Sequence, residues 1–200
     1  MIINNEISQN TPEWIEARLG KPTASCFDQI VTGTGEQSKQ RHKYMMKLAG
    51  ERVTGRITEG YTNANMDRGH EQEQEAADYY SMIRGVELEK IGFILDDSRS
   101  YGCSPDRCMF GIDGGLEIKT AAPHVQAERL YSGWTCAEHH RQVMGCLLIT
   151  GMEWWDLMSY CPGMRDVTIR FHRDEIFLDK LRRELEIFCE ELDEIVKRIS

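Results

Sequence analysis

Three features that define other protein classes are missing from this sequence: a long apolar run, a paired-cysteine motif and a nucleotide-binding glycine loop. No hydrophobic stretch approaches the length of a membrane-spanning helix, and residues 1–10 lack the basic and apolar segments of a signal peptide. The absence of a G-x-x-x-x-G-K-S/T loop argues against an ATP-driven motor. We therefore expect no membrane segment, no signal peptide and an activity that does not depend on ATP.

The cysteines are poorly suited to disulfides or metal clusters. There are seven, an odd number, and no two have the C-x-x-C spacing. A disulfide framework normally uses an even number of cysteines, and an iron–sulfur cluster needs four thiolates grouped in space. We expect reduced thiols, as in a cytosolic protein.

Basic charge is scarce overall, but its distribution is uneven. A net charge of −9 argues against a generic nucleic-acid coat protein, which is usually basic. Residues 1–70, however, contain nine Lys and Arg against eight Asp and Glu, whereas the last 27 residues contain five against nine. A local DNA track is therefore compatible with the sequence. Because repeats, low-complexity tracts and Pro/Ser-rich linkers are absent, residues 1–200 are predicted to form a single domain.

Hydrophobic periodicity predicts helices near both ends of the chain and strands between them. Thr11, Pro12 and Gly20 are typical of a helix cap, a first turn and a stop. Residues 86–97 alternate like a strand, and residues 107–120 resemble a hairpin that closes at Asp113-Gly114-Gly115. The sum is an α/β fold with a mixed central sheet flanked by helices. The further expected elements are helices at 23–35, 39–55, 69–85 and 136–149, and strands at 153–160 and 166–173. In the helix at 39–55, Tyr44, Leu48 and Val53 lie on or near the apolar face.

The chain is expected to end in a helix with an apolar stripe that packs on the body or on a neighbouring subunit. The stripe consists of Leu181, Leu185, Phe188, Leu192, Ile195 and Ile199.

The hairpin concentrates three charged residues. Asp106 and Glu117, on adjacent strands, could converge on Mg²⁺, which takes one or two carboxylates together with waters and substrate phosphates. Lys119 follows Glu117 by two residues, so both side chains point to the same face of a strand. A Lys beside carboxylates stays protonated, so orienting a water and offsetting charge are its safer roles. Since this spacing also occurs by chance, a solvated hairpin with exposed charges is the alternative.

The surrounding motifs favour the catalytic interpretation. "SPD" at 104–106 and "EIK" at 117–119 resemble the PD-(D/E)xK phosphodiesterase motif. More specifically, the chain resembles the phage lambda exonuclease (YqaJ-type viral recombinase) family through four segments in the family's order: "RLGKPTAS", "RGHEQEQEA", "CSPDRCMFGIDGGLEIK" and "HHRQVMGCLLITG". The resemblance implies a restriction-endonuclease-like core and a single lambda-exonuclease-like domain.

The resemblance also implies roles for particular residues. Asp106 and Glu117 would bind metal with the Ile118 backbone carbonyl, Lys119 would act on the attacking water, and Gln142 matches an active-site Gln. The implied metal is Mg²⁺, with Mn²⁺ able to substitute.

Glu73 matches a helix Glu that lies by the metals in the family. Its neighbours Glu71 and Glu75 leave that register open, and an exposed helix face is the alternative.

A pocket for the terminal 5′-phosphate is implied for Arg18, Ser25 and Ser104. The alternatives are a surface ion pair for Arg18 and a simple helix cap for Ser25.

The sequence departs from the family pattern at two places. Arg107 follows "SPD" where the family often has Gly, which could alter the turn without removing the ligand. A Tyr often found near the Gln is absent, and His139 or His140 occupies that region, either beside the substrate or, as we favour, on the surface.

The resemblance implies an ATP-independent, metal-dependent deoxyribonuclease of phage or prophage origin in the cytoplasm of a bacterial host. It would digest one strand of double-stranded DNA in the 5′→3′ direction and leave 3′ tails for recombination. Its implied partners are double-stranded DNA ends, a single-strand annealing protein and further copies of the chain in a ring-shaped homotrimer, with no membrane. An endonuclease or resolvase on the same fold and a non-catalytic DNA-binding scaffold are the alternatives.

Overall fold

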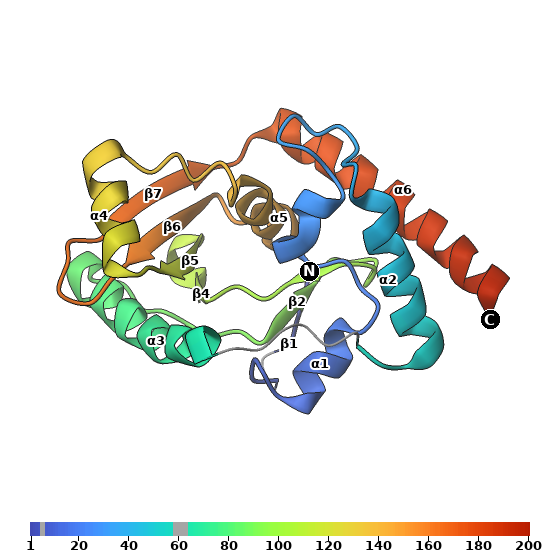
Figure 1. Cartoon of the computed structure of the whole chain (residues 1–200), viewed down its shortest axis with the longest axis horizontal. Helices are drawn as coiled ribbons and strands as arrows, with labels where there is room; N and C mark the ends of the chain where they lie inside the picture. Colours follow the sequence, from blue (N-terminus) through green and yellow to red (C-terminus); the bar gives the residue numbers. More distant parts are fainter. Residues whose placement is uncertain (5–6, 58–63) are drawn as a thin grey trace.

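The computed structural model describes residues 1–4, 7–57 and 64–200 (Figure 1). None of the helices in these ranges is both long and apolar enough to cross a membrane. The helices are α1 (Pro12–Arg18), the 3-10 helix η1 (Ala24–Gln29), α2 (Arg41–Thr54), α3 (Ala64–Arg84), the 3-10 helix η2 (Phe110–Ile112), α4 (Pro123–Ser132), α5 (His140–Thr150) and α6 (Glu175–Ile199), and the strands are β1 (Ile2–Asn4), β2 (Phe93–Leu95), β3 (Gly102–Cys103), β4 (Arg107–Met109), β5 (Gly114–Thr120), β6 (Trp154–Tyr160) and β7 (Val167–His172).

The strands form two sheets. The larger has the order β4-β5-β6-β7, with β5 parallel to β6 and the other pairs antiparallel, and the smaller is an antiparallel β1-β2-β3 sheet. Pro105 lies between β3 and β4, and a proline has no N–H to continue a ladder. The predicted α/β fold with a mixed sheet flanked by helices is confirmed, although the strands divide at this point.

The pleat of β6 shows how the two faces of the larger sheet are used. Trp155 and Leu157 belong to the main core, which also contains buried residues of α2, α5 and α6. Met158 and Tyr160 belong to a second cluster, which includes Ala76, Ala77 and Tyr80 of α3. The sheet is therefore covered by α3 on one face and by α5 on the other (Figure 1).

The apolar stripe of α6 packs within the chain. Helix α6 lies along α2 (Figure 1), and the rings of Phe188 and Tyr44 stack with centroids 5.9 Å apart. Leu181, Leu185 and Leu192 are fully buried, whereas Ile199 at the end of the helix is 55% exposed. The predicted seam against the body is confirmed for all but its last residue.

Several expected elements differ in detail. Val53 is 43% exposed because α2 turns it away from α6, so its expected position near the apolar face is wrong. The strand expected over residues 86–97 contains only β2, and α4, which begins at Pro123, was not predicted.

The hairpin closes one step earlier than predicted. Residues of η2 and Asp113, which has a positive φ of 56°, make the turn, whereas Gly114 and Gly115 are the first residues of β5. A Cβ on Gly115 would lie 2.3 Å from the Trp155 ring. The glycine is therefore required by the close approach of β6 rather than by the turn.

Asp156 links three elements on the α3 side of the sheet. It is 2% exposed and accepts hydrogen bonds from the Tyr80 hydroxyl at 2.6 Å and from Arg170 Nε and Nη2 at 2.7 and 3.0 Å. Burial and the bond to Asp156 raise the pKa of Tyr80, so its hydroxyl stays a donor. Arg170 also lies over the Trp154 ring at 3.5 Å.

We predict that Asp156→Asn lowers the free energy of unfolding by about 2–3 kcal/mol, because a buried carboxylate that accepts charge-assisted bonds is lost. Denaturant unfolding followed by circular dichroism measures the change. Asp179→Asn, which removes only an exposed ion pair with Arg182, is the control and is expected to change stability by less than about 0.5 kcal/mol. Equal effects of the two substitutions would contradict the prediction.

Candidate active site

Glu117 and Lys119 point from β5 toward α5. Lys119 Nζ donates a 2.8 Å hydrogen bond to Glu117 Oε1, and the Gln142 side-chain amide donates a 2.6 Å bond to the same oxygen. Lys119 Nζ also donates to Gln142 Oε1 at 3.1 Å. The structure thus brings together three residues predicted for catalysis in a closed set of contacts between β5 and α5.

Asp106 lies beside them, immediately before β4. Its Oδ2 accepts a 2.6 Å hydrogen bond from the Ile118 backbone N–H. Burial, followed by the charges of Glu117 and Glu73, raises the pKa of Asp106 well above its usual value. The like charges of Glu117 and Glu73 therefore disfavour the ionised form of Asp106.

Lys119 is the cation that faces this acidic group. Burial alone would lower the pKa of Lys119, but the charge and hydrogen bond of Glu117 and the charge of Asp106 outweigh it, so the pKa is raised. The side chain is therefore an ammonium at neutral pH, which suits it to orienting a water and offsetting charge.

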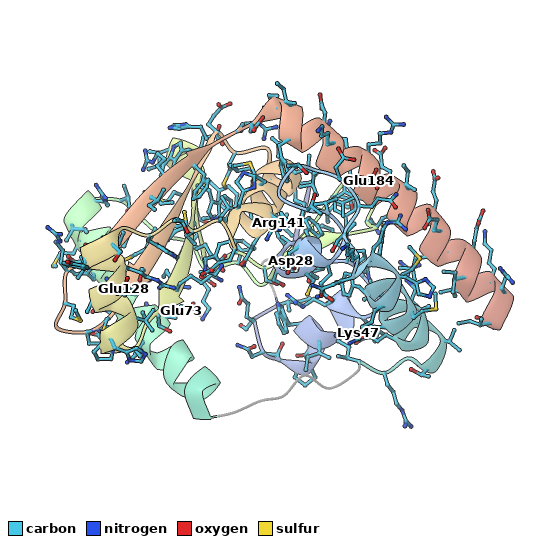
Figure 2. The ribbon with its side chains drawn as sticks, turned by 45° about the horizontal axis from the view of Figure 1, so that its top comes forward. Asp28, Lys47, Glu73, Glu128, Arg141 and Glu184 are labelled. Atoms are coloured by element: carbon cyan, nitrogen blue, oxygen red, sulfur yellow. The ribbon has the colours of Figure 1, made fainter. Side chains whose placement is uncertain are left out.

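Glu73 approaches Asp106 from the opposite side of the sheet. Arg107, whose side chain is 3% exposed, donates to Glu73 Oε1 at 2.8 Å and to the Asp106 carbonyl. Glu73 is labelled in Figure 2. Glu75 instead accepts a 2.8 Å bond from the Tyr160 hydroxyl, and the side chain of Glu71 lies outside the described residues. Of the two described side chains, Glu73 is the one at the site.

Arg107 is a site residue that sequence reasoning treated only as a departure. It alternates with Asp106 along the strand, so its side chain reaches the α3 face, where it also donates to Gln74 Oε1 at 2.9 Å. Its place directly after the Asp of "SPD" was the available signal.

The side chain of Arg18 meets Ser104 two residues before Asp106. Arg18 Nη1 donates a 2.9 Å hydrogen bond to Ser104 Oγ, and Trp14 Nε1 donates to the same oxygen at 2.9 Å. The Arg18 guanidinium lies 4.1 Å from the centre of the Trp14 ring, one turn earlier on α1. Burial lowers the pKa of Arg18, which still leaves it charged. Trp14 was not predicted at the site, although its i, i+4 spacing from Arg18 gave a signal.

Ser25 lies near this pair but does not bond to it among the described residues. Its hydroxyl is exposed and lies 3.3 Å from Thr23 Oγ1. Thr23 pairs in parallel with Gly102, and Ser25 follows two residues later as the second residue of η1.

Both candidate histidines are half-buried, and the favoured surface placement stays a prediction. His140 packs edge-on to Phe177 with ring centroids 4.8 Å apart. His139 packs edge-on to Trp134 at 5.7 Å, and burial together with the nearby Lys119 lowers the pKa of His139 to about 4.

The donor set fits a hard divalent cation. Glu117 Oε2 is buried without a hydrogen-bond partner, and the neighbouring Asp106 carboxylate is held in place by a backbone amide. Within the described ranges, no three His, Cys, Asp or Glu side chains form a complete metal cluster. Mg²⁺ takes one or two carboxylates and completes its shell with water and phosphate. The role predicted for the Ile118 carbonyl stays a prediction.

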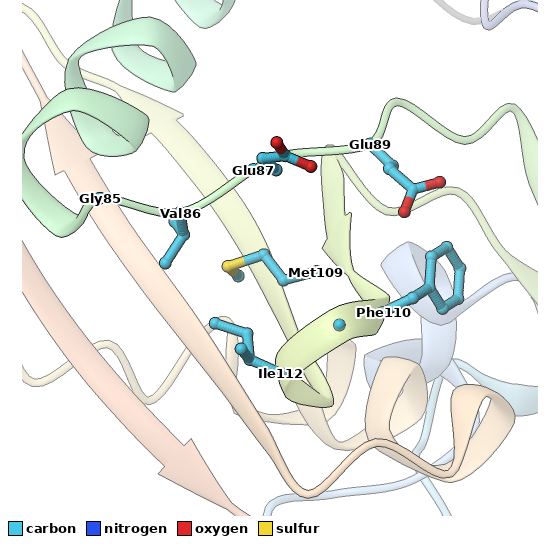
Figure 3. Close-up of a pocket in the computed structure, with 8 residues that line it drawn as sticks. Gly85, Val86, Glu87, Glu89, Met109, Phe110 and Ile112 are labelled. Atoms are coloured by element: carbon cyan, nitrogen blue, oxygen red, sulfur yellow. The ribbon is translucent and has the colours of Figure 1, made fainter.

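A hollow of about 260 Å³ lies apart from these residues, between the segment that follows α3 and the turn of the hairpin (Figure 3). Its walls include Val86, Met109 and Ile112, and it contains none of the residues predicted for catalysis.

Comparisons with known proteins identify the family and the fold of the chain. Residues 13–153 match the model of the YqaJ-like viral recombinase domain. The crystal structure of LHK-Exo in complex with dAMP is 30% identical with a TM-score of 0.83, and that of the alkaline exonuclease LHK-Exo from Laribacter hongkongensis is 29% identical with a TM-score of 0.84; each alignment covers 94% of this chain and 96% of the other.

A phage-related exonuclease from Haemophilus somnus 129PT shares the fold at 14% identity, with a TM-score of 0.72 over 90% of this chain and 96% of the other. The search of curated proteins finds no match. The fold is therefore of the PD-(D/E)xK type. From the match over residues 13–153 and the solved exonucleases that superpose on nearly its full length, the chain belongs to the YqaJ-like viral recombinase family.

Proposed function

We propose that this chain is a metal-dependent 5′→3′ exonuclease that digests one strand of double-stranded DNA and leaves 3′ single-stranded tails. The observation that carries the proposal is the close grouping of Asp106, Glu117, Lys119 and Gln142: Lys119 and Gln142 bond to Glu117 Oε1, and Glu117 Oε2 is buried without a hydrogen-bond partner. The nuclease class is supported by the family and by the two exonuclease structures of 29–30% identity.

The chemistry follows from the positions of the charges. Asp106 and Glu117 would hold Mg²⁺ or Mn²⁺, and Glu73 would add negative charge from α3. A cation bound there would neutralise charge on the phosphodiester and lower the pKa of a water. Lys119 orients the water and offsets the charge that develops, while Gln142 fixes both Lys119 and Glu117 through its amide.

The terminal 5′-phosphate would bind to Arg18, Ser104 and Ser25. A guanidinium offers a planar pair of donors to phosphate oxygens, and Arg18 is already held by Ser104 and Trp14. Because Ser104 is two residues from Asp106, a phosphate anchored there would place the next phosphodiester over the carboxylates. Each cut would then present a new 5′-phosphate to the same pocket.

The proposal includes the assembly and the partners. A ring-shaped homotrimer could enclose a duplex, which a single chain of 200 residues cannot easily do. A single-strand annealing protein would take the exposed 3′ strand, in the cytoplasm of a bacterial host that carries the phage or prophage. The family, a viral recombinase domain, supports this setting.

The direct test is digestion of end-labelled DNA with Mg²⁺ and then with EDTA. We expect linear duplex to be shortened from its 5′ ends, a closed circle to be spared and EDTA to stop the reaction. Cutting of the closed circle would instead indicate an endonuclease or resolvase, and binding without cutting would indicate a scaffold.

Lys119→Ala is expected to reduce the cleavage rate by about 10²–10⁴-fold, because a positioned charge on the reacting water is lost while both metal-binding carboxylates remain. Calorimetry with Mg²⁺ should show binding close to that of the wild type. Lys197→Ala, an exposed residue at the far end of α6, is the control. A Lys119→Ala turnover near that of the control would refute the catalytic role.

Arg18→Ala is expected to abolish most of the preference for phosphorylated ends. The wild type should digest 5′-phosphate ends about tenfold to a hundredfold faster than 5′-hydroxyl ends, since a charge-assisted contact stabilises by roughly 1.5–3 kcal/mol. The ratio of the two initial rates, measured within each variant, is independent of the amount of folded protein. Arg183→Ala, on the exposed face of α6, should keep the ratio. Equal wild-type rates on both ends would contradict the proposed 5′-phosphate pocket but not the proposed metal site.

A further inference from the structure

A second hollow, of about 470 Å³, opens between α4 and the segment that leads into α5. No predicted site residue lines it. The lining of the hollow includes Glu128, Arg129, Trp134, Thr135 and Glu138.

Flat groups form one wall of this hollow. The Arg129 guanidinium lies 4.3 Å from the centre of the Trp134 ring, and Arg129 Nη1 is held by a 2.8 Å hydrogen bond to Ser159 Oγ. His139 meets the same indole edge-on. Guanidinium and indole planes are the surfaces on which unpaired nucleobases stack.

The charges of the hollow disfavour a phosphate. Glu128, labelled in Figure 2, and Glu138 place two carboxylates at its rim against the single guanidinium of Arg129. His139 adds no charge at neutral pH, because burial and Lys119 lower its pKa to about 4. Carboxylates repel phosphate oxygens but accept hydrogen bonds from the amino groups of bases.

Helix α5 connects the hollow to the proposed catalytic residues, because His139 contacts Trp134. His139 is the N-cap of α5, and Gln142 follows one turn later on the same helix, where it bonds to Lys119. Residues three apart are neighbours on a helix surface. A nucleotide at the carboxylates could therefore extend its strand toward Trp134.

We propose that this hollow binds one unpaired nucleobase of the DNA substrate by stacking on the Arg129–Trp134 layer. The inference rests on the proposed exonuclease function and adds a base-binding position to it. The base belongs either to the strand being cut or to its complement, and the two sources differ in the test.

The test places a single abasic residue at successive positions near the end of a duplex, in one strand at a time. For the wild type, loss of the base that occupies the hollow should slow initial digestion roughly five- to hundredfold. The strand in which the abasic residue has this effect identifies the source.

Substitutions in the hollow should remove this sensitivity. Trp134→Ala and Arg129→Lys are expected to digest intact and abasic duplexes at nearly equal rates, and Arg129→Lys keeps the charge while it loses the plane. Thr135→Trp, at an exposed position, should also remove the sensitivity to the abasic residue, because the larger side chain fills the hollow. This variant tests the proposal if Trp134→Ala does not fold. Tyr131→Ala is the control, because Tyr131 lies on α4 outside the hollow and is 91% exposed.

Fluorescence anisotropy of a labelled duplex with a frayed end measures binding in EDTA, where no cutting occurs. The Kd for the abasic duplex divided by the Kd for the intact duplex then replaces the ratio of digestion rates. A wild type whose rates and Kd are unaffected by every abasic position would overturn the proposal, as would an undiminished abasic effect in the three hollow variants. A wild type that binds with abasic sensitivity but does not cut would instead refute the exonuclease function and leave the base site standing.

Discussion

The active-site region depends on holding the carboxylates of Asp106 and Glu117 together out of water. Burying like charges is unfavourable, and burial together with the charges of Glu117 and Glu73 raises the pKa of Asp106. Two of the carboxylate oxygens accept hydrogen bonds: Asp106 Oδ2 from the Ile118 backbone amide, and Glu117 Oε1 from Lys119 and Gln142. The other oxygen of Glu117, Oε2, is buried without a hydrogen-bond partner, and a bound cation could satisfy it.

The pleat of the larger sheet makes this arrangement possible without sacrificing the core. On β5, Leu116 and Ile118 pack toward α3, while Glu117 and Lys119 face α5. The same alternation applies to β4. Arg107 follows Asp106 by one residue, so its guanidinium lies on the opposite face of the sheet, where it binds Glu73. The carboxylates of Glu117 and Glu73 are thus each paired with a cation, Lys119 on the α5 face and Arg107 on the α3 face. The alternate apolar residues of β5 pack against α3.

The sequence was most informative where the signal is local. A spacing of two residues correctly placed Glu117 and Lys119 on one face, whereas Gln142 and Glu73 could be proposed only from the family resemblance, because their approach depends on how α5 and α3 pack. Helix α4 was missed although it begins with Pro123, and the one residue that it buries fully is the polar Gln126. Arg107 was read as a change of turn because its partners lie more than thirty residues away along the chain.

An acidic chain whose proposed substrate is DNA, itself an acidic polymer, depends on where its few cations lie. Arg18, Lys119 and Arg129 are each held by a hydrogen bond to a fixed partner, and burial acts against the charged form in all three. Charges removed from water interact more strongly than exposed ones, so a small number can outweigh an unfavourable net charge nearby. The surplus acid of the last 27 residues lies on α6, on the far side of α2 (Figure 1), where it would repel DNA from that surface rather than from the carboxylates. The distribution of charge, rather than its sum, is what makes the chain compatible with a DNA substrate.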